Sequence, residues 1–181
     1  MGMCPKKKII DAYINIELQL GNNDRVKKIF QSYIQKFPGD ENVWLNFCKF
    51  EESINENNVA EILYSNSIKF LKENKNISGL YTMYNELINF YMNIMKQKDK
   101  KEKIRNKIKK TFEDMLKDKN IIKNIEIEKQ IELWDKYAGI YSDNKKYDEM
   151  DKIYKRCLEE IVWGVEDEEL KIKYIAIIIN N

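Results

Sequence analysis

The side chains that could do chemistry in this sequence are mainly carboxylates and lysines, because the chain contains no histidine. Without histidine there is no Ser–His or Cys–His nucleophile pair, and the commonest general base and metal ligand is missing. The three cysteines, Cys4, Cys48 and Cys157, are far apart and form no Cys-x-x-Cys pair, which favours neither a zinc site nor a disulfide framework. The sequence also has no glycine-rich phosphate-binding loop. These absences favour a protein that is not an enzyme and that uses no cofactor or metal.

The densest group of carboxylates is the run from Glu166 to Glu169. A calcium loop would need oxygen ligands at alternate positions and a central glycine, and this run has neither. Acidic residues are favoured in the first turn of a helix, where they face the positive end of the helix dipole. We therefore interpret the run as the start of a helix.

The strongest local charge lies between Lys96 and Lys110, a segment that contains eight lysines and one arginine but only two acidic residues, Asp99 and Glu102. Such a cluster is typical either of contacts with RNA phosphates or of a solvent-exposed helix face. The segment contains no aromatic residue on which a base could stack, which favours the solvent-exposed face. The side chains that would contact RNA under the first interpretation are Lys100, Lys101, Lys103, Arg105 and Lys107.

A repeated helical pattern organises the rest of the chain. Large apolar residues recur at relative positions 0, 3 and 6 with a glutamate or tyrosine at position 7, which together form one face of a helix. The first two copies are 34 residues apart, and the last lies 124 residues after the first. The four copies are Ile10, Tyr13, Ile16 and Glu17; Trp44, Phe47, Phe50 and Glu51; Tyr84, Leu87, Phe90 and Tyr91; and Trp134, Tyr137, Ile140 and Tyr141.

Each copy is followed by a second apolar helical pattern. These patterns are Val26, Ile29, Phe30, Tyr33 and Ile34; Ala60, Leu63, Tyr64, Ser67 and Ile68; Ile108, Phe112, Met115 and Leu116; and Met150, Ile153, Tyr154, Cys157 and Leu158. Two helices per unit with a 34-residue period are typical of a helical repeat array. The chain also has only 6 glycines and 2 prolines among 181 residues. The sequence therefore predicts an all-α fold, an α-solenoid of antiparallel helix pairs.

We predict one repeat domain over residues 1–181, with units at 6–37, 41–74, 78–118 and 126–162 and a half unit at 168–180. Turn residues such as Gly21 and the Pro38-Gly39-Asp40 run separate the helices. The predicted helices are 6–20, 23–37, 41–54, 57–74, 78–97, 100–118, 126–142, 146–162 and 168–180.

The residues expected to form the repeat core are those at the most regular positions of these patterns. They are Tyr13, Glu17, Phe30, Trp44, Phe47, Glu51, Tyr64, Tyr84, Phe112, Trp134, Tyr137 and Tyr154. Trp163 lies outside the register, between two predicted helices, where it either docks a partner or holds the last helix in place.

The overall composition does not indicate one particular class of partner. The 32 basic and 30 acidic residues leave a net charge of +2, which gives no general attraction to nucleic acid or acidic membranes. No stretch reaches the roughly 18 apolar residues that span a bilayer, so we expect no membrane contact.

The repeat resembles the half-a-TPR repeat, in which the first helix reads Trp-x-x-aromatic-x-x-Phe-Glu, as it does from Trp44 to Glu51. The first fifty residues further resemble the crooked-neck family: Cys4-Pro5-Lys6 precedes a Glu-Leu-Gln-Leu string at 17–20 and an Asp-Arg helix start at 24–25. The resemblance implies a scaffold subunit of the Nineteen complex, which acts in the nucleus in spliceosome activation and binds other protein subunits.

The family pattern places arginine on the second helix, three residues before the aromatic position. Here that position holds Lys27, Glu61, Lys109 and Asp151. Glu61 and Asp151 reverse the charge in their units, which argues against the glutamate–base pair there, whereas Glu17 and Lys27 retain the charges to form it. Two alternatives stay open for function: direct RNA binding by residues 96–110, and a general TPR-like module that binds peptides.

Overall fold

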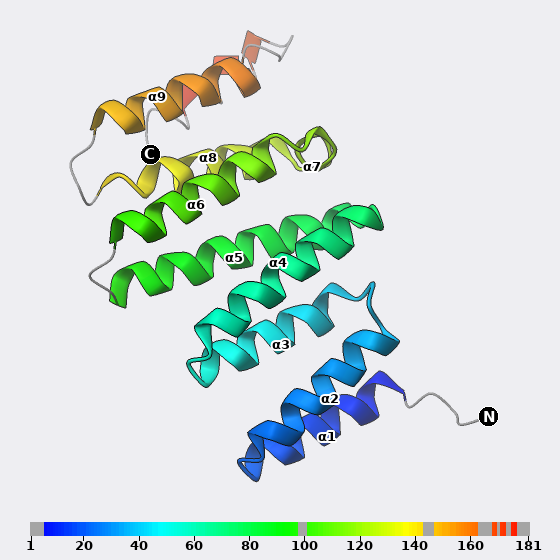
Figure 1. Ribbon diagram of the computed structural model, residues 1–181. Helices are drawn as coiled ribbons and strands as arrows, with labels where there is room; N and C mark the ends of the chain where they lie inside the picture. The colour runs from blue at the N-terminus through cyan, green and yellow to red at the C-terminus, as the bar shows by residue number, and fades with distance from the viewer. Residues whose placement is uncertain are drawn as a thin grey trace. The chain divides into compact units, whose positions relative to one another are not determined.

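The protein is built from α-helices throughout the part that the computed structural model describes, which is residues 6–97, 101–142, 147–162, 168–169, 171–172 and 175–176. Within these ranges there is no strand, which confirms the predicted all-α class and its repeat of helix pairs (Figure 1). The first five helices are α1 (Lys7–Gln19), α2 (Asn23–Lys36), α3 (Glu41–Ser53), α4 (Asn57–Glu73) and α5 (Ile77–Gln97). They are followed by α6 (Lys101–Leu116), α7 (Lys119–Lys123), α8 (Ile127–Gly139), α9 (Tyr147–Cys157) and a π-helical turn, η2 (Leu158–Val162).

Helix boundaries differ from the sequence prediction mainly in the second half. The short helix α7 is not among the predicted helices, because five residues are too few to show a helical period. Its N-cap residue is Asp118, whose side chain accepts a hydrogen bond from the backbone N–H of Asn120. The predicted helix 146–162 is divided into α9 and η2, and most of the predicted half unit 168–180 lies outside the described residues.

The turns that end the first helix of the first two pairs repeat with the apolar pattern. Gly21 and Asn55, which are 34 residues apart, both have a positive φ, 71° and 61°. At both sites the next backbone N–H returns to a carbonyl in the last helical turn: Asn22 bonds Glu17 and Glu56 bonds Glu51, each at 2.9 Å. This is the Schellman arrangement, in which glycine or asparagine is favoured at the left-handed position. The same local chemistry therefore closes α1 and α3.

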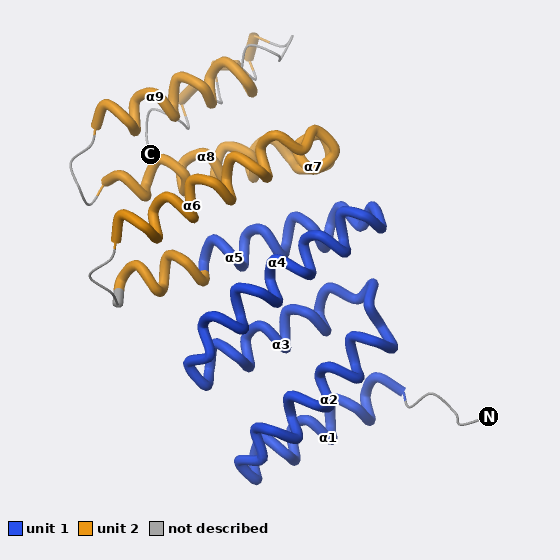
Figure 2. The backbone as a smooth tube through the Cα atoms, viewed as in Figure 1, with its two compact units in different colours: residues 1–89 blue, residues 90–181 orange. Residues whose placement is uncertain are grey.

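The chain divides into two compact units, Met1–Asn89 and Phe90–Asn181, with the boundary inside α5 (Figure 2). Unit 1 holds the pairs α1–α2 and α3–α4 with the first part of α5, and unit 2 holds the rest of α5 with the helices from α6 onward. That all 181 residues act as one repeat domain stays a prediction.

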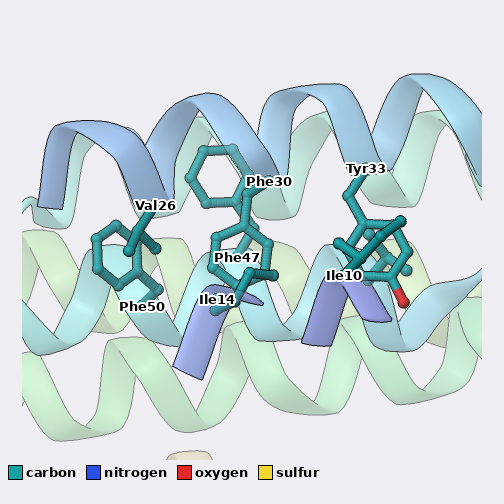
Figure 3. Packing of buried hydrophobic residues seen from close by; sticks show 8 residues of the cluster. Ile10, Ile14, Val26, Phe30, Tyr33, Phe47 and Phe50 are labelled. Atoms are coloured by element: carbon teal, nitrogen blue, oxygen red, sulfur yellow. The ribbon is translucent and has the colours of Figure 1, made fainter. Parts of the chain in front are cut away.

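The core of unit 1 forms where α2 packs between α1 and α3. Figure 3 shows three α2 side chains on one helical face: Val26 lies beside Phe50, Phe30 beside Phe47 and Ile14, and Tyr33 beside Ile10. The Phe30 and Phe47 rings stack with centroids 5.1 Å apart and planes 8° apart. Helix α2 therefore fills the space between one helix pair and the next, as a repeat array requires.

Unit 2 uses the same positions for its own core. Phe112 on α6 stacks on Tyr137 of α8, with ring centroids 4.8 Å apart and planes 17° apart. Tyr137 occupies the position of Phe47 in the repeat, and Phe112 occupies that of Phe30. Each unit thus contains one junction in which a second helix stacks an aromatic ring on the first helix of the next pair.

Candidate interaction surfaces

The predicted repeat-core residues lie mainly in the interior of their units, where they fill space rather than face a ligand. Tyr154 is half-buried, and Tyr13 is the one exception, treated below. The buried members are Glu17, Phe30, Trp44, Phe47, Glu51, Tyr64, Tyr84, Phe112, Trp134 and Tyr137.

Tyr13 departs from the expected core: its side chain is 46% exposed, whereas Phe47, one repeat later, is 3% exposed. The difference follows from packing, because Phe47 lies under the ring of Phe30 on α2. Within the described residues of unit 1, no such ring covers Tyr13. Ile16 is exposed for the same reason, although its equivalent, Phe50, is buried. Among the described residues, the α1 face of the first pair is therefore exposed.

Three tyrosines join helices through hydrogen bonds to carboxylates that the sequence pattern did not single out. The hydroxyl groups of Tyr64 and Tyr154 donate to Glu52 (2.6 Å) and Asp135 (2.7 Å). Tyr137 on α8 donates to Glu113 on α6 at 2.8 Å. Burial, followed by the neighbouring carboxylate, raises the pKa of each of these tyrosines above its usual value. Burial and Asp11 likewise raise the pKa of Tyr33 to about 12.

These shifts predict that stability falls at alkaline pH. An unfolded tyrosine loses its proton near pH 10, while the folded protein holds these protons to higher pH. The contribution of these tyrosines to the free energy of unfolding is therefore complete below about pH 10 and is lost above it.

At acid pH, burial of Glu113 opposes ionisation, but hydrogen bonds from Arg156 and Tyr137 outweigh the effect of burial and lower the pKa of Glu113. Stability contributed by Glu113 is therefore lost as pH falls below about 4.5. Thermal melting followed by circular dichroism should show a plateau near neutral pH and a lower Tm on both sides; an unchanged Tm at pH 11 would contradict the tyrosine argument.

The two buried glutamates at position 7 of the repeat, Glu17 and Glu51, contact basic or amide side chains of α2 or of the turn before it. Glu17 accepts hydrogen bonds from Asn22 (2.7 Å) and Arg25 (3.2 Å) within its own helix pair. The Asn22 bond is the main cause of its lowered pKa. Lys27, the expected partner of Glu17, instead lies 3.2 Å from Glu51 of the next pair. The prediction of a Glu17–Lys27 pair is therefore wrong: Lys27 ties α2 to α3, and the Glu51 side chain it reaches is 1% exposed.

The basic segment is less suited to RNA than its charge indicates. Arg105 is 1% exposed, and its guanidinium donates to the Ile140 carbonyl (3.1 Å) and to Glu102, so it is a structural residue and not an RNA contact. Lys107 is half-buried, with its ammonium 5.5 Å from the ring centre of Tyr91, a cation–π contact. Lys101 and Lys103 are exposed as expected, and Lys100 lies outside the described residues.

Reversing the exposed charges should leave the fold intact. Lys101, Lys103, Lys109 and Lys110 are all exposed on α6, so changing all four to glutamate is expected to alter the free energy of unfolding little, within about 0.5 kcal/mol per site. If this surface contacts RNA, affinity for a single-stranded oligouridine should fall and lose its salt dependence. Fluorescence anisotropy at two salt concentrations measures both. Equal affinity before and after the change would exclude this surface as an RNA site.

A largely apolar groove lies between α1 and α2 on the exposed α1 face. Its volume is about 370 Å³, and we call it the Tyr13 groove. It is lined by Ile9, Ile10, Tyr13, Lys28, Ile29, Ser32, Tyr33 and Lys36. A second hollow of about 440 Å³, between α1, α2 and α3, is more polar and includes Asp11, Asn15, Asn46 and Lys49. Both are surfaces on which another molecule could lie.

Metal-binding and membrane-spanning features are not found in the described part of the chain. There, no group of three or more His, Cys, Asp or Glu side chains could hold a metal ion. No helix in those residues is both long enough and apolar enough to cross a membrane. Trp163, the other predicted docking residue, lies outside the described residues.

Comparisons with known proteins place these features in a family context. The family model of the PRP39 N-terminal HAT repeat matches residues 15–171. The chain is 32% identical over 68 residues to pre-mRNA-splicing factor CLF1 of Kluyveromyces lactis, a match that covers 38% of this chain and 10% of that protein. It is 31% identical over 68 residues to human crooked neck-like protein 1, covering 38% of this chain and 8% of that protein. The matches thus span about a tenth of the length of these relatives.

Proposed function

The chain belongs to the PRP39 N-terminal HAT-repeat family, and from that premise we propose that it is a non-catalytic scaffold in a pre-mRNA splicing complex. The observation that carries the proposal is the family match, because it runs through the repeats of both units. Proteins similar to part of this chain are named pre-mRNA-splicing factor CLF1 and crooked neck-like protein 1. The more specific proposal is a subunit of the Nineteen complex, located in the nucleus.

Protein contacts on the repeat surface are the proposed means of action. The regular side chains of the repeat are mostly buried, where they hold the helices together. What the described structure offers to a partner is surface: the exposed α1 face, the Tyr13 groove and the more polar hollow beside α3. These features support a binding role.

Two other functions are weaker candidates. RNA binding by the basic segment loses two of its expected contacts, because Arg105 is buried and Lys107 lies against Tyr91. A general peptide-binding module is favoured by one observation, the amide side chains of Asn15 and Asn46 in the hollow between α1 and α3. Such amides offer both a donor and an acceptor to a peptide backbone.

Sedimentation of nuclear extract tests the proposed splicing role. A tagged copy of the full chain, expressed in the organism that encodes it, should be found in the nucleus and should co-sediment in a glycerol gradient with spliceosomal small nuclear RNAs and proteins. If the chain instead sediments alone, at the position of a protein of 21.8 kDa, the scaffold proposal fails.

A further inference from the structure

The hollow of about 440 Å³ beside α3 lies between two consecutive helix pairs, with walls from α1 and α3 and a base on α2. Ile14, Phe30 and Phe50, one from each of these helices, are buried and give it an apolar floor (Figure 3). Two amide side chains line its walls, Asn15 on α1 and Asn46 on α3, and we call it the Asn15–Asn46 hollow. An apolar floor with a few polar groups around it is typical of binding sites.

This hollow lies on the opposite side of α1 from the exposed Tyr13 face. Ile9, Tyr13 and Ile16 form one side of the helix, and the α1 residues that line the hollow are centred about half a turn away. A helix packed over Tyr13, as Phe30 is packed over Phe47 one repeat later, would therefore leave the hollow uncovered. The hollow belongs to the junction between two repeats that the structure contains.

The next junction of unit 1 is bridged at the equivalent positions. Moving 34 residues along the chain takes Asn15 to Lys49, and the 40 residues that separate the Trp44 and Tyr84 copies take Asn46 to Glu86. The Lys49 ammonium lies 2.9 Å from the Glu86 carboxylate, so an ion pair connects α3 to α5 there. The positions that carry opposite charges in the second junction thus carry two neutral amides in the first.

The two amides are available to another molecule. Asn15 and Asn46 are both exposed, and within the described residues neither side chain makes a hydrogen bond. Each offers one acceptor oxygen and two donor hydrogens. An extended chain has backbone N–H and C=O groups to pair with them, whereas an α-helix uses its own backbone groups internally. The pair of amides therefore suits an extended segment better than a helix.

The charges around the hollow favour a basic segment. The ammonium of Lys49 is already shared between Glu52 (3.3 Å) and Glu86 (2.9 Å), so it leaves little positive charge for a ligand. Asp11, exposed on the α1 wall, adds a carboxylate. A lysine or arginine on the bound segment would complement this carboxylate.

We propose that the Asn15–Asn46 hollow binds an extended segment of another protein. Backbone groups of the segment pair with the two amides, an apolar side chain lies on the floor beside Leu18, and a lysine or arginine lies near Asp11. We assign the segment to another protein because the repeat array itself, in its described part, supplies helices joined by short turns. The inference rests on the proposed scaffold function and adds to it the kind of partner.

A variant that copies the second junction into the first provides the test. Asn15→Lys with Asn46→Glu, the bridged variant, places the Lys49–Glu86 ion pair across the hollow. A phage library of randomised linear peptides is selected on the full chain after subtraction on the bridged variant, and the enriched peptides are synthesised with a fluorescent label. Fluorescence anisotropy should show binding to the wild type and none to the bridged variant, although circular dichroism shows that the variant melts at or above the wild-type Tm.

Matched variants separate the hollow from general effects of charge. Asn58→Glu with Asn66→Lys introduces the same two side chains at exposed positions of α4 and should bind the peptides like the wild type. Asn15→Ala with Asn46→Ala removes the amides without a bridge and should weaken binding about tenfold. This second variant also serves if the bridged variant does not fold. Asp11→Asn should weaken binding about threefold, as expected for an exposed ion pair.

The conformation of the peptide is tested with proline. An extended segment tolerates proline at positions that do not pair with the amides, whereas a bound helix is broken by it. Loss of binding with proline at every position would contradict an extended segment.

Three further results would overturn the proposal: no peptide enriched on the wild type, equal affinity of the enriched peptides for the wild type and the variant with both asparagines changed to alanine, and a dimer in sedimentation equilibrium that the bridged variant dissociates. The last would mean that a second copy occupies the hollow. Peptide binding is read independently of splicing. A chain that binds these peptides at the hollow but fails to co-sediment with spliceosomal components would retain the site and lose the splicing role.

Discussion

Phe47→Ala is expected to lower the free energy of unfolding by about 3–5 kcal/mol, whereas Tyr13→Ala should cost about 1 kcal/mol or less. The two residues occupy the same position in successive repeats, so the comparison changes burial while sequence context stays similar. Phe47 is buried and stacked on Phe30, and its removal leaves a cavity between α2 and α3. Tyr13 is half exposed and loses little more than a surface contact and its bond to Glu17.

Urea unfolding of both variants beside the wild type measures this difference. A loss of the size expected for Phe47 is a large part of the stability of most domains, so partial unfolding at room temperature is also expected. Similar losses for both variants would mean that Tyr13 is covered in solution. That result would contradict the exposure of Tyr13 in the structure.

Arg105→Ala is expected to lower the free energy of unfolding by about 2–4 kcal/mol, far more than changes of the exposed lysines on α6. The guanidinium is buried and donates to the Ile140 carbonyl at the end of α8, so truncation leaves that carbonyl without its donor and empties the space of a long side chain. Lys103→Ala, on the exposed side of the same helix, is the matched control and should change stability by less than about 0.5 kcal/mol.

Thermal or urea melting of the two α6 variants checks this prediction. The result also bears on function, because Arg105 has the charge of an RNA contact and the environment of a core residue. If Arg105→Ala melted like the wild type but lost affinity for oligouridine, Arg105 would be a surface residue, and the structural role assigned to it would be wrong.

The helical repeat could be predicted because its signal is local and periodic. The pattern of Trp44, Phe47 and Phe50 repeats at 34 residues, and the turn chemistry of Gly21 and Asn55 repeats with it. Since both signals lie within a few residues of each other, the boundaries of α2 and α3 could be placed within one residue. Helix α7 could not be found because it is shorter than the pattern that reveals a helix.

The exposure and pairing of single residues could not be predicted in the same way, because they depend on neighbours in space. Tyr13 has the sequence pattern of a core residue, but its burial depends on whether a second helix lies over it. The spacing of Lys27 would allow it to reach Glu17 within its own helix pair. In the structure it instead forms an ion pair with Glu51 of the next pair. Arg105 has the same charge as its lysine neighbours, but it is buried and lies on the same face of α6 as Ile108 and Phe112. A helical-wheel count over α6 separates Arg105 from Lys103 and Lys110, which lie on the opposite side, but not from Lys101, which lies one turn earlier on the same face.

Affinity purification of the tagged full chain from nuclear extract, with and without ribonuclease and followed by quantitative mass spectrometry, tests the scaffold account most directly. The account predicts that splicing proteins are enriched and remain bound after ribonuclease treatment, because repeat-surface contacts with protein hold the complex together. It also predicts the same proteins with the four α6 lysines changed to glutamate. Recovery without splicing proteins, or their complete loss on ribonuclease treatment, would contradict the account.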